Sequence, residues 1–230
     1  MPDNWGGIML IKTIAKILLL SAMLVGCTST PEIQTGPDAE VTYDGLTRVD
    51  NTVMDAAWKL ADVDISEFTK VKLLGAGIEF RFVTGSGTRL SGQNEFPLDE
   101  SQQERLRQTI TDAFTDEMSN SERFELVETT GPDTLLVRGA LLDVVSNVPP
   151  ERIGRSQVFL SSVGEATLVL EVRDSVTFAI LARAVDRRAA ARRGTSVQAN
   201  SVTTWAEVRR LANRWAQQLR IGLESIDGET

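Results

Sequence analysis

The sequence predicts an α+β fold, in which an antiparallel sheet is covered by helices on one face as a two-layer sandwich, after a cleaved signal and a flexible tether. Two patterns lead to this fold class. Residues 164–173 alternate polar and apolar side chains, as in an antiparallel strand with one face in solvent. Residues 99–118 and 204–223 repeat apolar side chains at helical spacing along a single stripe. Elements that are apolar on one side only are stable when they pack together as layers.

The first half of the chain is expected to contain a short helix, two strands and a long helix. Apolar residues at helical spacing predict the short helix over residues 53–60. Residues 68–74 and 78–83 alternate as two strands with a glycine bend between them. Asp99 precedes Gln102 at the spacing of a capping box, so an amphipathic helix of about twenty residues is expected to follow.

The second half is predicted to be mostly strand. The expected strands cover residues 124–128, 135–148, 164–173 and 180–188, with a turn between the last two. A final helix is expected after Thr204, which precedes Glu207 in a second capping box.

The N-terminal residues have the pattern of a bacterial secretory signal. A basic region precedes an apolar run over residues 17–25, which ends at the small Gly26. The run is roughly ten residues long, half of the ~20 that a membrane-spanning helix needs. We therefore expect residues 1–26 to be removed as a signal peptide. Translation from either Met1 or Met9 is compatible with this pattern.

The stretch Leu24-Val25-Gly26-Cys27 resembles the lipobox of bacterial lipoproteins. This resemblance implies cleavage before Cys27 and its modification with several acyl chains such as palmitate. At ~0.8 kcal/mol per buried methylene, several chains make attachment to the membrane effectively permanent. In that class, Thr28 in place of an aspartate implies the outer membrane. Residues 27–42 are then the lipidated cysteine and a flexible linker, and residues 43–230 a single periplasmic domain.

Composition excludes several kinds of site. The chain has one cysteine and no histidine, so it has neither an internal disulfide, nor a Cys/His metal cluster, nor an imidazole-activated nucleophile. Its formal net charge of −8 disfavours nucleic-acid binding. Residues 62–66 begin like a calcium loop, but Glu67 and Leu73 stand where that loop needs a glycine and a carboxylate. We predict no metal and no cofactor.

Five arginines lie close together in this acidic chain: Arg183, Arg187, Arg188, Arg192 and Arg193. One interpretation is an anion-facing patch for lipid phosphates, acidic glycan or the carboxylates of a partner, since arginine forms bidentate pairs with such groups. The other, which we favour, is that Arg183 and Arg187 line the solvent side of a strand. There they would pair with Glu165, Glu171 or Asp186.

Four stretches together resemble a family of bacterial lipoproteins known as domain of unknown function thirty-three thirteen. They are YDGLTRVDN (43–51), DISEFTKVKL (64–73), RGALLDVVSNVPP (138–150), and GEATLVLEVRDS with LARAVDRRA (164–189). The resemblance implies a periplasmic lipoprotein and supplies no catalytic residues. Phe178 departs from the pattern, because such turns often place glycine there.

The sequence therefore predicts a lipid-anchored periplasmic protein of the outer membrane that acts as an interaction or accessory module of the cell envelope. Its expected partners are the membrane, through the anchor, and another envelope protein or glycan. The alternative is a carboxylate-dependent hydrolase that acts on envelope glycan. That enzyme would need two carboxylates from different strands to converge in a cleft.

Overall fold

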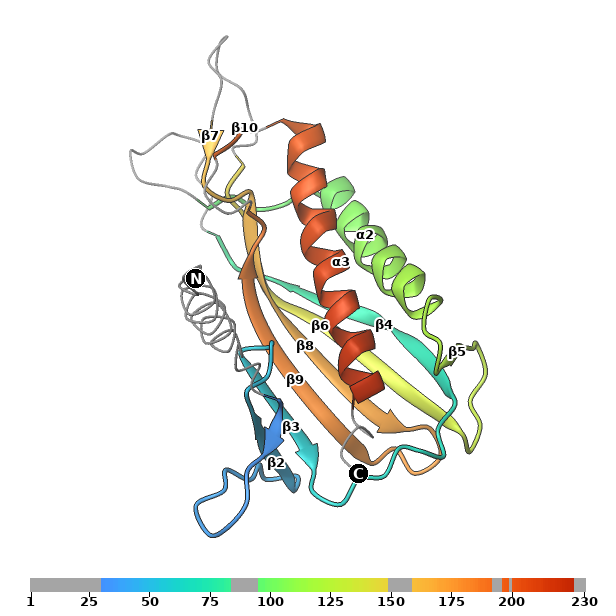
Figure 1. Cartoon of the computed structure of the whole chain (residues 1–230). Helices are drawn as coiled ribbons and strands as arrows, with labels where there is room; N and C mark the ends of the chain where they lie inside the picture. The colour runs from blue at the N-terminus through green and yellow to red at the C-terminus, as the bar shows by residue number, and fades with distance from the viewer. Residues whose placement is uncertain (1–29, 84–94, 149–158, 192–195, 199, 226–230) are drawn as a thin grey trace, which may run out of the picture. The chain divides into compact units, whose positions relative to one another are not determined.

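Eight strands form one sheet in the order β1-β2-β3-β9-β8-β6-β4-β5 (Figure 1). A computed structural model of the chain describes residues 30–83, 95–148, 159–191, 196–198 and 200–225. The strands of the sheet are β1 (Glu32–Ile33), β2 (Leu46–Asp50), β3 (Ala56–Leu60), β4 (Lys70–Phe80), β5 (Glu125–Leu126), β6 (Thr134–Ser146), β8 (Gly164–Asp174) and β9 (Ile180–Ala189). A separate ribbon pairs β7 (Phe159–Leu160) with β10 (Val197–Gln198).

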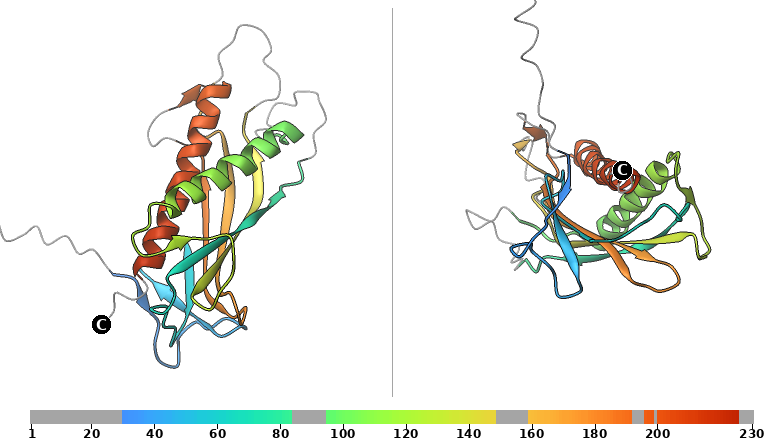
Figure 2. Two further views of the ribbon diagram at one scale, coloured as in Figure 1. Left: turned by 90° about the vertical axis from the view of Figure 1, so that its right-hand side faces the viewer. Right: turned by 60° about the horizontal axis from the view of Figure 1, so that its bottom comes forward.

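Two helices, α2 (Glu100–Met118) and α3 (Ser201–Ser225), cover one face of the sheet (Figures 1 and 2). We call the covered side the inner face and the opposite side the outer face. The apolar stripes of both helices are buried in one core with the inner residues of the sheet. These helix residues are Leu106, Ile110, Ala113, Phe114 and Met118 from α2 and Ala212, Trp215, Ala216, Leu219 and Leu223 from α3. The predicted α+β class, with helices on one face, is confirmed.

Only one of the two predicted helix starts is right. The capping box of α2 is present: Asp99 Oδ1 accepts from the Gln102 amide at 2.9 Å, and Asp99 N donates to the Gln102 side chain at 3.0 Å. In contrast, α3 begins at Ser201, before the predicted Thr204. Asn200 Oδ1 accepts from the amides of the two residues after Ser201, each at 3.0 Å, so the first turn is capped upstream.

Residues 56–60 form strand β3, so the helix predicted over residues 53–60 is wrong. The strand lies between β2 and β9 and pairs antiparallel with both. Backbone hydrogen bonds to strands on both sides stabilise the extended conformation. They outweigh the weak preference for a helix that a spacing of small apolar residues over two turns provides. The two strands predicted around residues 68–83 are likewise one strand, β4, and a bulge between Leu74 and Gly77 replaces the expected bend.

The sheet is mixed, whereas the sequence predicted an antiparallel one. Strand β4 pairs parallel with β5 and β6, and the other pairs within the sheet are antiparallel. Helix α2 follows β4 and brings the chain back to the end of the sheet at which β4 began. The next strands, β5 and β6, therefore run parallel to β4. The connection from β4 through α2 thus differs from the short turn that joins the antiparallel strands β8 and β9.

One compact unit spans Pro31–Thr230 and therefore begins within the segment predicted as a linker. Glu32 and Ile33 pair with Asp50 and Val49 of β2, which accounts for their order. The predicted signal peptide and Cys27 lie outside the described residues. Neither described helix is long and apolar enough to cross a membrane.

Candidate functional site

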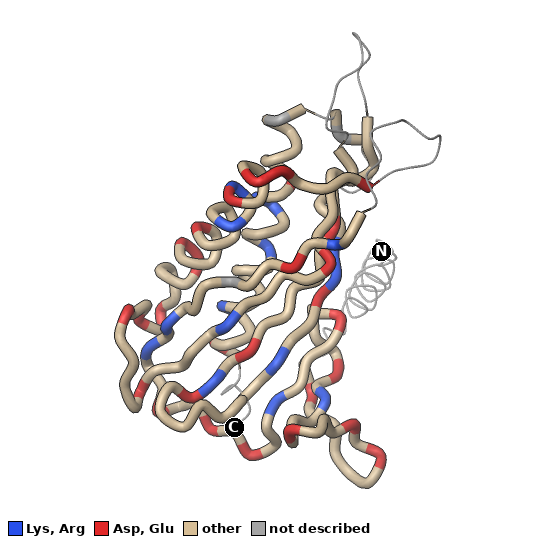
Figure 3. Tube along the Cα trace, turned by 180° about the vertical axis from the view of Figure 1, so that it is seen from behind, with Lys and Arg blue, Asp and Glu red and all other residues tan. Residues whose placement is uncertain are grey.

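Charged residues lie beside one another on neighbouring strands of the sheet (Figure 3). The strand register aligns one row of outer-face residues over five strands: Arg138, Glu171, Arg183, Trp58 and Arg48. Opposite charges alternate along part of this row, and the Arg48 guanidinium lies over the Trp58 ring at 4.9 Å from its centroid. Cross-strand pairs of these kinds stabilise a sheet.

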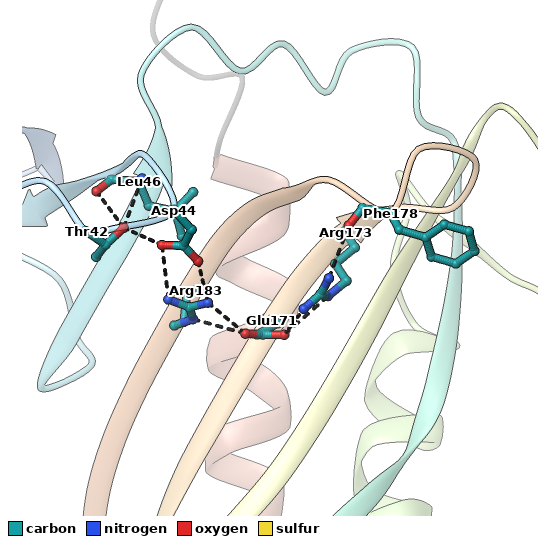
Figure 4. Close-up of polar contacts among 7 residues, drawn as sticks. All are labelled: Thr42, Asp44, Leu46, Glu171, Arg173, Phe178 and Arg183. Atoms are coloured by element: carbon teal, nitrogen blue, oxygen red, sulfur yellow. Dashed lines mark hydrogen bonds and ion pairs between the residues drawn. The ribbon is translucent and has the colours of Figure 1, made fainter.

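Arg183 is the centre of the first charge cluster on this face (Figure 4). Its Nη2 atom lies 2.7 Å from Asp44 Oδ2 and 2.9 Å from Glu171 Oε1. Arg173 binds the other oxygen of Glu171 at 2.7 Å. Burial raises the pKa of Glu171, but the hydrogen bonds from Arg173 and Arg183 outweigh burial, so the net pKa lies below its ordinary value.

A second cluster surrounds Arg81, which sequence reasoning missed. Its guanidinium forms a bidentate pair with Asp143 and also binds Glu165 at 2.8 Å. Arg187 reaches the same Glu165 oxygen at 2.7 Å. The hydrogen bonds from Arg81 are the largest cause that lowers the pKa of Asp143 and of Glu165.

The position of Asp143 depends on irregular backbone in β6. Between Leu142 and Val145, β6 has one residue more than its partner β8, and Asp143 in this bulge has φ 57°. The left-handed conformation re-aims the Asp143 side chain toward Arg81. A sequence pattern with a period of two gives no signal of such a shift.

The third described arginine of the predicted cluster lies on the inner face. Arg188 contacts Asp186, and Asp186 in turn accepts from the indole Nε1 of Trp215 at 2.7 Å. The structure therefore does not bring Arg183, Arg187 and Arg188 into one patch. Arg183 and Arg187 pair with Glu171 and Glu165, as the ion-pair interpretation predicts, and Arg188 pairs with Asp186. The other two arginines, at positions 192 and 193, lie outside the described residues.

Asp143 and Glu165 are two carboxylates from different strands that meet at one arginine, so they bear on the hydrolase alternative. Both have a lowered pKa because Arg81 hydrogen-bonds to their ionised forms. Glycoside hydrolysis needs one carboxyl group that stays protonated near neutral pH. This pair is ionised at neutral pH and does not supply that acid. Within the described parts of the chain, no group of three or more acidic, His or Cys side chains could hold a metal ion.

The turn between β8 and β9 holds Phe178 in an unfavourable conformation. Its φ is 60°, and 61% of the residue is exposed. Left-handed backbone costs a residue with a side chain about 1–2 kcal/mol. The turn is held by Asp174, whose side chain accepts from the Val176 amide at 2.6 Å, and by Arg173, which donates to the Phe178 carbonyl at 3.1 Å.

A continuous chain of polar contacts joins this turn to the loop before β2 (Figure 4). From Arg173 it passes through Glu171 and Arg183 to Asp44, which accepts from Thr42 Oγ1 at 2.6 Å. Tyr43 lies between the last two residues and is 97% exposed. Figure 4 shows the Phe178 ring pointing away from the polar chain. Tyr43 and Phe178, two of the exposed aromatic residues of the described chain, are thus carried by loops that one network holds in place. We call these two residues the aromatic pair.

Several solved structures resemble this chain at low identity. The PelC dodecamer from Paraburkholderia phytofirmans is 8% identical, with a TM-score of 0.33 over 70% of this chain and 96% of that chain. Protein XCC0632 from Xanthomonas campestris, of family DUF330, is 12% identical, with a TM-score of 0.38 over 71% and 89%. A putative neuraminyllactose-binding hemagglutinin homolog from Helicobacter pylori is 10% identical, with a TM-score of 0.33 over 72% and 86%.

No curated protein matches the sequence. A family model described as "Protein of unknown function (DUF3313)" matches residues 39–219, which include the whole main sheet except β1, all of α2 and most of α3. The chain belongs to the DUF3313 family of proteins of unknown function.

Proposed function

We propose that this protein is a lipid-anchored, periplasmic-facing component of the outer membrane that acts as an interaction or accessory module of the cell envelope. The lipobox-like Leu24–Cys27, behind its apolar run, is the observation that carries the location. Acyl chains on Cys27 would hold the folded unit beside the bilayer, and the linker after it would let that unit reach a partner.

The anchor can be tested with Cys27→Ser in the native host. We expect the wild-type protein to fractionate with the outer membrane and to be heavier than its unmodified mature chain by the mass of the acyl groups. The variant should be uncleaved or should move to the soluble periplasmic fraction. Normal processing and outer-membrane fractionation of Cys27→Ser would contradict lipid anchoring.

The aromatic pair supports the interaction role. Phe178 keeps a strained backbone while most of its surface is in solvent, so burial within its own chain does not explain the residue. Exposed aromatic side chains on rigid loops are typical anchors of protein interfaces. The proposed partner is therefore an envelope protein with an apolar pocket that receives the Phe178 ring, with Tyr43 as the second contact.

Crosslinking in cells, followed by mass spectrometry, tests this contact. We expect Phe178→Gly and Tyr43→Ser each to reduce the yield of one specific crosslinked protein while the protein level stays constant. Val202→Ser is the matched control, since Val202 is 77% exposed but lies on α3. Equal crosslinking of wild type and both aromatic variants would refute the role of the pair. Retention on cell-wall glycan that depends on Phe178 would instead indicate a glycan partner.

A further inference from the structure

One row of residues on the outer face carries no polar side chain across five strands. The strand register aligns Gly77 of β4, Ala140 of β6, Val169 of β8, Val185 of β9 and Ala56 of β3. We call these residues the apolar row, and all five are at least partly exposed. Strand positions that face solvent are usually polar, so this row needs an explanation.

The two charge clusters lie on either side of the apolar row. On β9, Arg183 of the first cluster lies two residues before Val185, and Arg187 of the second lies two residues after it, which separates the two arginines by about 14 Å. Across the strands the row extends for about 19 Å. Its small side chains thus form an apolar strip between two ion-paired borders. An α-helix with its side chains is about 10–12 Å wide, so the strip can receive one segment of another protein.

Gly77, at the β4 end of the row, has no structural reason within this chain. An added Cβ would meet nothing within 4 Å, and the residue has no positive φ, so neither steric crowding nor the neighbouring bulge requires a glycine there. Glycine weakens a strand and often marks a place where another backbone or a ligand approaches closely. A partner that lies on the apolar row accounts for this glycine.

Arg138 supplies an unpaired positive charge beside the row. It is exposed and lies opposite Glu171, but both oxygens of Glu171 are already bound, by Arg183 at 2.9 Å and by Arg173 at 2.7 Å. Within the described ranges Arg138 has no hydrogen bond or ion pair, and neither has Lys72 on the adjoining strand β4. Two unpaired cations at one border of the strip are complementary to a carboxylate.

We infer that the apolar row and Arg138 form a second docking surface, which binds a segment of a partner protein with apolar side chains for the row and a carboxylate for Arg138. A protein segment fits better than a membrane, because a flat anionic lipid surface would also face the carboxylates Asp143 and Glu165 of the second cluster. The inference goes beyond the proposed contact through the aromatic pair, and it requires neither that pair nor the lipid anchor.

A photoreactive side chain tests the contact in the native host. p-Benzoylphenylalanine is placed at Gly77 and, as the matched control, at Gly222 of α3, because both glycines are exposed and an added Cβ at either meets nothing within 4 Å. We expect one discrete crosslinked protein from Gly77 and none from Gly222. No discrete product from Gly77, or a product with lipid or with a second copy of this chain, would overturn the inference. The Gly77 crosslink is scored separately from those of the aromatic variants, so either surface can fail without the other.

Charge reversal tests the role of Arg138 in the same crosslink. Arg138→Glu should reduce the yield from Gly77 by at least about tenfold, because two negative charges would then face each other. Arg209→Glu makes the same change at an exposed arginine of α3 that also has no ion pair among the described residues, and it should leave the yield unchanged. Thermal unfolding checks that both variants are folded.

A change in the partner completes this test. The carboxylate of the partner segment, located by mass spectrometry of the crosslinked product, is replaced by arginine. This replacement should restore the crosslink to Arg138→Glu and weaken the one to the wild type. A yield that does not depend on Arg138, or that falls equally with Arg209→Glu, would overturn the inference, as would a partner segment without a carboxylate.

Discussion

The indole Nε1 of Trp215 donates a hydrogen bond of 2.7 Å to Oδ2 of Asp186, a residue with no exposed surface. The same carboxylate binds the Arg188 guanidinium and accepts from the Asp55 amide at 3.3 Å. These contacts join α3, β9 and the segment before β3 within the core. A buried charge is tolerated when it is paired and fully hydrogen-bonded, as here.

Removal of this carboxylate is expected to be among the most destabilising single changes. Asp186→Ala leaves the Arg188 charge and the Trp215 donor without their partner and should lower the free energy of unfolding by about 3–5 kcal/mol. Trp215→Phe loses one hydrogen bond to a charged group, together with some packing, and should cost about 1.5–3 kcal/mol. Urea denaturation measures both, with the exposed Asp62→Ala as the control. A loss below about 1 kcal/mol for Asp186→Ala would show that this network is dispensable.

The free energy of unfolding is expected to fall in acid, because carboxylates on the outer face have pKa values below their ordinary ones in the folded protein. The pKa of Asp143 is lowered from 3.8 and that of Glu165 from 4.5, chiefly by hydrogen bonds from Arg81. At pH values between the folded and the ordinary pKa values, the unfolded chain therefore binds more protons than the folded chain. The stabilisation is present above the ordinary pKa values and is lost as the pH falls through the lower, folded values.

Urea denaturation at a series of pH values from about 7 to about 3 measures this dependence. Arg81→Gln removes the main cause of both shifts, so its unfolding free energy should depend less steeply on pH than that of the wild type. Identical slopes for the two proteins would place the acid sensitivity elsewhere in the chain.

Phe178→Gly is expected to stabilise the folded protein while it weakens partner binding. Glycine at this position removes a left-handed strain of about 1–2 kcal/mol, and its greater freedom in the unfolded chain costs about 0.5–1 kcal/mol. The free energy of unfolding should therefore rise by up to about 1.5 kcal/mol. Val176→Gly, in the same turn but without a positive φ, is the control and should give no gain. Thermal unfolding distinguishes them, and a Phe178→Gly protein that melts below the wild type would contradict the strain.

Gly164→Ala should destabilise the sheet where β8 begins. An added Cβ would lie 2.5 Å from the Val145 carbonyl oxygen, so one of the two paired strands has to move. Such overpacking costs about 1–3 kcal/mol. Gly222→Ala in α3 is the matched control, since its Cβ meets nothing within 4 Å and alanine favours a helix by about 0.8–1 kcal/mol. Equal melting temperatures for the two variants would count against the close contact.

Local patterns predicted the elements that are long and regular. Strand β8 buries every second residue from Ala166 to Val172, as its alternation indicated, and α2 begins after the predicted cap at Asp99. Short segments were ambiguous, because the helical spacing over residues 53–60 fits a strand equally well once β2 and β9 lie on either side. The candidate site was predicted in part: Arg183 and Arg187 pair with Glu171 and Glu165, but the bulge that brings Asp143 to Arg81 has no signature in the spacing.

The sequence by itself determined the one-sided strands, the single apolar stripe of each helix and hence the two-layer α+β arrangement, since these follow from periods of two and 3.6 residues along the chain. Only the tertiary structure decided that β4 runs parallel to its neighbours, that Asp44 binds Arg183 from 139 positions away and that Phe178 adopts a left-handed conformation. Pairing, register and strain depend on which distant segments meet, and local spacing carries no information about that choice.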